Sequence, residues 1–142
     1  MEAGTYTIEG GDYDRGGSAS EHLKELLKRI GVDPKAVRRA MVAAYEAEMN
    51  VVVHARRGVM KAAVTPTHLE VALTDEGPGI PDIPLAMKEG YSTAPAEARA
   101  RGFGAGMGLP NIKRSTDRFS IQSALGRGTH LRFTIYLKPP SS

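Results

Sequence analysis

The chain has 142 residues, of which 41% are hydrophobic and 25% charged, the composition of one ordinary globular domain over residues 1–142. Its net charge of +3 comes from 19 basic and 16 acidic residues, which is too balanced to indicate nucleic-acid binding by itself, although the pI near 9.3 leaves that function open. The chain has no cysteine, which excludes disulfides, thiolate catalysis and cysteine-ligated zinc. We find neither an apolar stretch of membrane-spanning length nor a signal peptide, so we expect a cytoplasmic protein.

The first part of the chain predicts a strand and two helices. Residues 5–9 alternate in the manner of a short edge strand. A glycine-rich loop then leads to a helix over residues 18–30, for which Ser18 or Ser20 is the candidate N-cap. A long helix follows over residues 34–56. Its apolar stripe, which should face a sheet, consists of Val37, Met41, Ala44, Val51 and Ala55.

The second part of the chain predicts two hairpins, separated by a long irregular segment and a helix. The four strands are expected at residues 59–64, 69–74, 118–123 and 130–137, the irregular segment at 75–108 with one helical turn near 85–88, and the helix at 109–115. So long a loop in a small domain is expected to be functional. The fold class is therefore α+β, a two-layer sandwich with a mixed, mainly antiparallel sheet and helices on one face.

Glu46 and Asn50 are the first candidates for chemistry. They are four residues apart on the long helix, so they lie one above the other on the same face. A carboxylate can accept a proton and a carboxamide oxygen can coordinate a hard cation, although a solvated helix face would show the same pair. Glu48 projects into the apolar stripe, where the sequence offers no explanation for a charge. We therefore choose Glu46 as the chemical residue.

Two glycine-rich segments follow. Asp75 directly follows the strand predicted at residues 69–74, so its carboxylate can bond a ligand amino group, while Gly77 and Gly79 let the backbone pass close to a flat ring. A plain turn is the alternative. Over residues 102–108, four glycines alternate with other residues directly before a predicted helix, where free N–H groups suit a phosphate. A flexible linker is the alternative there.

In this order and spacing, the motifs resemble the ATP-binding domain shared by gyrases, histidine kinases and MutL, known as the GHKL or Bergerat fold. The resemblance covers residues 18–137 and is carried by Glu46 and Asn50, then Asp75-x-Gly-x-Gly79, then Gly104-x-Gly-x-Gly108-Leu109, then Gly128-Thr129. Within that superfamily, residues 46–55 are similar to the stretch found in the small anti-sigma factor and switch protein-serine kinases of bacteria.

The resemblance implies a role for each matching residue. Glu46 would be the general base, Asn50 would coordinate Mg²⁺, and Asp75 would bond the adenine amino group. A lid over residues 80–108 would close around the nucleotide. The residues around the base and the phosphates would be Gly77, Gly79, Gly104, Gly106, Met107, Gly108, Leu109 and, through water, Thr129.

The resemblance also implies an activity and a partner. We expect an ATP-binding anti-sigma regulatory factor that acts as a Mg²⁺-dependent protein-serine kinase on a small antagonist protein of the anti-anti-sigma kind, with a sigma factor as a second candidate partner. The alternative is a catalytically weak, nucleotide-gated protein-binding module of the same fold. No dimerisation helix pair with a phosphoacceptor histidine and no following lysine-bearing domain is evident, so we expect the small regulatory branch. The sequence leaves a homodimer open.

Overall fold

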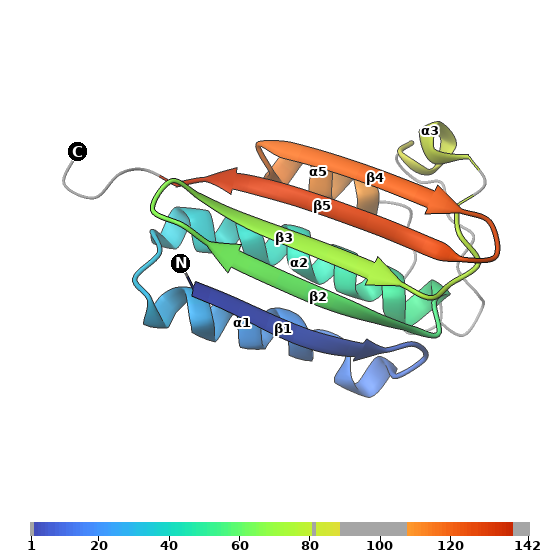
Figure 1. Cartoon of the computed structure of the whole chain (residues 1–142), viewed down its shortest axis with the longest axis horizontal. Coiled ribbons are helices and arrows are strands. Elements are labelled where there is room, and N and C mark those ends of the chain that lie inside the picture. The colour runs from blue at the N-terminus through green and yellow to red at the C-terminus, as the bar shows by residue number, and fades with distance from the viewer. Residues whose placement is uncertain (1, 81, 89–107, 138–142) are drawn as a thin grey trace.

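The computed structural model describes residues 2–80, 82–88 and 108–137, and every element named below lies within these ranges (Figure 1). The strands are β1 (Glu2–Glu9), β2 (Arg57–Val64), β3 (His68–Asp75), β4 (Arg118–Ala124) and β5 (Gly128–Tyr136). The helices are α1 (Ser18–Arg29), α2 (Pro34–His54), α3 (Ile83–Ala86) and α5 (Gly108–Ser115), with a short 3-10 helix, η1 (Tyr13–Arg15), before α1. The strands and helices expected within these ranges are confirmed, with small shifts at their ends.

The five strands form one open sheet in the order β1-β2-β3-β5-β4. β1 is an edge strand, as its short alternating sequence predicts. Each of the four described pairings is antiparallel, so this sheet lacks the parallel pair that a mixed sheet would have. Because β3 pairs with β5, the C-terminal end of β3 lies next to the start of β5. That contact places Asp75 beside the β4–β5 hairpin, although 54 residues separate Asp75 from Thr129.

Three helices cover one face of the sheet, and α2 lies between α1 and α5 (Figure 1). Of the stripe expected on α2, Val37, Ala44 and Val51 are buried, whereas Met41 and Ala55 are only partly buried. The buried face is wider than this stripe because α2 contacts both other helices as well as the sheet. Small side chains permit this close packing, and the buried alanines of α2 are Ala36, Ala40, Ala43, Ala44 and Ala47.

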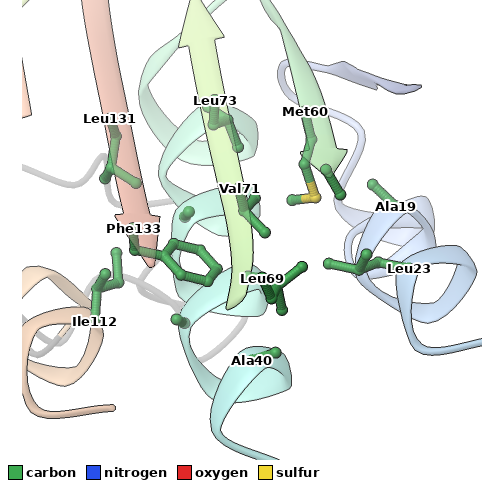
Figure 2. Packing of buried hydrophobic residues seen from close by; sticks show 14 of the residues in the cluster. Ala19, Leu23, Ala40, Met60, Leu69, Val71, Leu73, Ile112, Leu131 and Phe133 are labelled. Atoms are coloured by element: carbon green, nitrogen blue, oxygen red, sulfur yellow. The ribbon is translucent and has the colours of Figure 1, made fainter. Parts of the chain in front are cut away.

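The core forms between this helical layer and the inner face of the sheet. Leu69 and Val71 alternate along β3 with less buried residues, as expected for a strand that has one covered face. Figure 2 shows these side chains, with Phe133 of β5, gathered between Ile112 of α5 and Leu23 of α1. Burial of each large apolar side chain stabilises the fold by about 1.5–3 kcal/mol. Within the described ranges, no helix has the length and hydropathy needed to cross a membrane.

The start of α1 differs from the sequence prediction. Its N-cap residue is Gly17, with φ of +102°, and neither Ser18 nor Ser20 caps the helix. Glu48 of α2, which is 2% exposed, accepts hydrogen bonds from the backbone N–H groups of Gly17 (2.9 Å), Ala19 (3.1 Å) and Ser20 (2.9 Å). It also accepts one from Ser20 Oγ at 2.7 Å. These four bonds explain why a charge is tolerated in the apolar stripe, because a buried carboxylate is stable only when it is well bonded.

Candidate functional site

The first part of the site forms where α2 meets α5. Glu46 and Asn50 lie on the side of α2 that faces Gly108, the first residue of α5. A Cβ atom on Gly108 would lie 3.3 Å from Glu46 Oε2 and 3.7 Å from Asn50 Oδ1, so glycine permits this close approach. The fold therefore brings together Glu46, Asn50 and the end of the glycine-rich segment. The first N–H groups of a helix have no partner within it, so those of Gly108 and Leu109 suit an anion at the same place, whereas Pro110 has no N–H to offer.

A further polar residue on α5 contacts the glutamate. Asn111 Nδ2 lies 3.4 Å from Glu46 Oε1, and Arg114 Nη2 donates a hydrogen bond of 2.6 Å to Asn111 Oδ1. Sequence reasoning missed Asn111. The sequence did contain a signal for this residue. Asn111 lies three residues after Gly108, so on a helix it is on the same side as Gly108, one turn later.

The donor atoms at this end fit a hard cation shared with a phosphate ligand. No group of three or more His, Cys, Asp and Glu side chains that would enclose a metal occurs among the described residues. Mg²⁺ needs no such enclosure, because it binds through one or two protein oxygens and completes its shell with water and substrate phosphates. The amide oxygen of Asn50 and the carboxylate of Glu46 are oxygen ligands of this kind.

The second part of the site is built around Asp75 at the end of β3. Its Oδ1 accepts a hydrogen bond of 3.1 Å from the backbone N–H of Thr129, and the backbone N–H of Gly77 donates another bond to the carboxylate. Burial raises the pKa of the Asp75 carboxyl group, and these two backbone hydrogen bonds act in the opposite direction. Two donors use about half of the acceptor positions of a carboxylate, so Asp75 retains capacity for a ligand amino group.

Close backbone approaches explain the glycines that follow Asp75. A Cβ atom on Gly77 would lie 3.1 Å from the Cβ atom of Ala55, at the C-cap of α2. Gly79 has φ of +81°, and a Cβ atom there would lie 2.5 Å from the carbonyl oxygen of Ala124. The loop after β3 therefore passes close to both α2 and the β4–β5 hairpin, while packing of these two glycines against a flat ring stays a prediction.

Thr129 is joined to the same loop through Ser123. The two hydroxyl oxygens are 3.1 Å apart, and Ser123 Oγ accepts a hydrogen bond of 2.6 Å from the backbone N–H of Ile80. Sequence reasoning missed Ser123 as well. On β4 it is in phase with the inward-facing Phe119 and Ile121, and a serine in that apolar series was a signal for a polar contact on this face of the strand.

Part of the predicted site lies outside the described residues, namely Gly104, Gly106, Met107 and positions 81 and 89–107 of the predicted lid. Leu109 is described, and its side chain is buried at 8% exposure in the core. Its side chain therefore anchors the start of α5. Only its backbone is available to a phosphate, so a nucleotide contact there stays a prediction.

Fold and site together define a class of protein. A Bergerat-type ATP-binding domain has an open sheet with helices on one face, and the antiparallel sheet described above has this form. Such a domain also has an acid and an amide on the central helix, a glycine at the start of the next helix and a partly buried aspartate at a strand end, as this chain does. Residues 12–135 match the model of the histidine kinase-like ATPase domain, and the chain belongs to this family.

The chain is also similar to curated bacterial regulators. It is 30% identical over 119 residues to the serine/threonine-protein kinase RsbT of Bacillus subtilis (strain 168), which is 81% of this chain and 84% of that protein. It is 29% identical over 103 residues to an anti-sigma F factor of Thermoanaerobacter sp. (strain X514). This second match covers 72% of this chain but only 64% of the length of the relative.

Two solved structures share the fold. A crystal structure of the RsbU and RsbW domains of a Mycobacterium tuberculosis protein matches with a TM-score of 0.66 and 17% identity, over 99% of this chain and 34% of that chain. The mycobacterial sensor histidine kinase MprB matches with a TM-score of 0.55 and 17% identity, over 96% of this chain and 99% of that chain. At this identity the likeness concerns the fold alone.

Proposed function

We propose that this chain is an ATP-binding anti-sigma regulatory factor that acts as a Mg²⁺-dependent protein-serine kinase on a small antagonist protein. Membership of the ATPase-domain family and the similarity to a kinase and to anti-sigma factors support this function. The observation that carries the kinase activity is the position of Glu46 beside Asn50 and Gly108. Under this proposal residues 1–142 work as one domain in the cytoplasm, where bacterial transcription takes place.

Glu46 is the proposed general base. In the reaction, the hydroxyl oxygen of the acceptor serine bonds to the γ-phosphorus of ATP, and the bond from that phosphorus to ADP breaks. Glu46 takes the serine proton on Oε2, the oxygen that faces Gly108. The N-terminus of α5 would stabilise the phosphate charge. At the other end, Asp75 accepts a hydrogen bond from the adenine amino group and fixes the orientation of the nucleotide.

Asn50 is the proposed metal ligand. Its Oδ1 would hold Mg²⁺, which when bound neutralises phosphate charge. Replacing Asn50 by alanine should abolish the Mg²⁺ dependence of ATP affinity and leave the fold intact, because Asn50 is only partly buried and alanine favours a helix. Calorimetric titration of ATP with and without Mg²⁺ measures this. The control Asn50→Asp retains an oxygen ligand and should keep the dependence. Equal Mg²⁺ dependence in wild type and Asn50→Ala would remove Asn50 from the site.

A second substitution tests the adenine end. Asp75→Asn should weaken ATP binding by about 1.5–3 kcal/mol, because it replaces a charged acceptor in a partly buried bond. Calorimetry measures the affinity, and Asp33→Asn, at the exposed start of α2, is the control that should change nothing. An unchanged affinity in Asp75→Asn would place the adenine elsewhere.

The pH dependence of binding provides a further check on Asp75. Because burial raises the pKa of this carboxyl group, it becomes protonated at a higher pH than an ordinary aspartate when the pH falls. The protonated group is a poorer acceptor, so the affinity ratio of wild type to Asp75→Asn should decrease toward acidic pH. Taking the ratio cancels the protonation of ATP itself. A ratio that rises toward acidic pH would contradict the proposed role.

Phosphoryl transfer to a protein tests the function as a whole. The protein is purified and incubated with ATP, Mg²⁺ and the proteins encoded beside it, and each product is examined for phosphoserine by mass spectrometry. We expect one small acceptor protein to gain phosphoserine. ATP-dependent binding of the same protein without any phosphoserine would instead support the nucleotide-gated binding module, in which the nucleotide only controls partner binding.

A further inference from the structure

A chain of three side chains leads from the surface of α5 to the proposed base. Asn111 and Arg114 are three residues apart and so lie on the same side of this helix. Arg114 Nη2 donates to Asn111 Oδ1 at 2.6 Å, and Asn111 Nδ2 is directed at Glu46 Oε1 at 3.4 Å. Glu46 and Asn111 are 65 residues apart in sequence, so this contact exists only in the folded domain.

The orientation of the Asn111 amide follows from the chemistry of its neighbours. A guanidinium group only donates hydrogen bonds, so the Asn111 oxygen must face Arg114. The amide nitrogen then points toward Glu46, whose ionised carboxylate only accepts. Both contacts agree with this one orientation. Rotating the amide by half a turn would place its nitrogen against the Arg114 donor and its oxygen against the Glu46 acceptor.

The two oxygens of Glu46 consequently have different surroundings. Oε1 faces the Asn111 amide, whereas Oε2 lies toward Gly108, 3.3 Å from where a Cβ atom on that glycine would be. The oxygen near the start of α5 is therefore the one available to a reacting hydroxyl group. At 3.4 Å this contact is longer than an ordinary N–H···O hydrogen bond of about 2.7–3.2 Å, and such contacts at reaction centres often shorten when the substrate binds.

We propose that Asn111, itself oriented by Arg114, is a positioning residue that holds Oε1 of Glu46 so that Oε2 faces the acceptor serine. This inference rests on the proposed kinase function. It assigns α5 two tasks: its first residue leaves room for the phosphates, and the next turn orients the base. Because a general base is effective only when it is held in reach of its proton, losing this contact should slow the reaction while ATP binding persists.

The test compares Asn111→Ala with wild type, with phosphoserine formation on the co-encoded acceptor protein as the measure of turnover. We expect kcat to fall by roughly tenfold or more, the usual effect of losing a hydrogen bond to a charged group, with KM for ATP changed less than twofold. Asn111→Asp keeps the shape but loses the donor, so its kcat should fall at least as far. Arg118→Ala, which removes an exposed arginine on β4, is the control and should match wild type.

Repeating the Asn111→Ala substitution in the Glu46→Gln variant separates a positioning role of Asn111 from a merely structural one. In Glu46→Gln there is no base to orient, so adding Asn111→Ala should change the residual turnover by less than about twofold. Circular dichroism confirms that each variant is folded. An equal fall in both backgrounds, or an unchanged kcat in Asn111→Ala, would overturn the inference alone. A wild-type protein without any Glu46-dependent transfer would overturn the kinase proposal and this inference together.

Discussion

Replacement of Glu46 by glutamine is expected to slow phosphoryl transfer by roughly 10²–10⁴-fold, the usual contribution of a positioned general base. Binding of ATP and Mg²⁺ should persist, because the amide preserves the shape of the side chain. The reason for this loss is that Glu46 is the carboxylate that the fold places beside Asn50 and Gly108. Single-turnover measurement of phosphoserine formation, together with calorimetric ATP affinity, gives both quantities for wild type and variant.

Glu48→Gln is the matched control, because Glu48 is also a glutamate of α2, two residues further on. Its carboxylate bonds to the start of α1 and not to α5, so turnover per folded molecule should stay close to the wild-type value. Loss of turnover in Glu48→Gln with Glu46→Gln still active would show that the wrong glutamate has been chosen. No turnover even in the wild type, with partner binding still dependent on ATP, would favour the gated binding module.

Glu48 should instead matter for stability. Removing its carboxylate in Glu48→Ala leaves buried N–H donors at the start of α1 without partners, including those of Ala19 and Ser20. Each buried unsatisfied donor costs about 1–3 kcal/mol, so we expect the free energy of unfolding to fall by about 3 kcal/mol. For a chain of this size that corresponds to a decrease in Tm of about 10 °C.

Urea unfolding followed by circular dichroism measures this difference. Glu46→Ala is the comparison variant, because Glu46 is only partly buried and its hydrogen bond to Asn111 is long at 3.4 Å. It should change the free energy of unfolding by less than about 1 kcal/mol. Similar stability of Glu48→Ala and wild type would mean that water replaces the carboxylate at the start of α1, and that Glu48 does not anchor that helix.

The sequence predicts best what depends on short-range periodicity. The hairpin of two short strands, β2 and β3, and the four-residue spacing of Glu46 and Asn50 are local properties, and the structure has them where they were expected. The sequence also predicts Asp75 directly after a strand, and in the structure it is the last residue of β3. That these separate motifs contribute to one site is a prediction from their resemblance in order and spacing to a known family, because no local pattern specifies which helix packs on which.

What the sequence could not provide are the contacts between distant segments. The cap of α1 was assigned to Ser18 or Ser20 because both are local, but the atoms that bond its backbone belong to Glu48, 28 to 31 residues away. Asn111 was missed for the same reason, since its partner Glu46 is on another helix. An apolar stripe interrupted by a charge shows that a buried partner exists, but only the fold identifies which segment supplies it.

A crystal structure of the protein with a non-hydrolysable ATP analogue and Mg²⁺ would examine both ends of the proposed site at once. We expect the adenine amino group within about 2.7–3.2 Å of a carboxylate oxygen of Asp75. We also expect Mg²⁺ about 2.1 Å from Asn50 Oδ1, with the γ-phosphate beside Glu46 at the start of α5. A nucleotide bound away from Asp75, or Mg²⁺ held by residues other than Asn50, would contradict the assignment of this site.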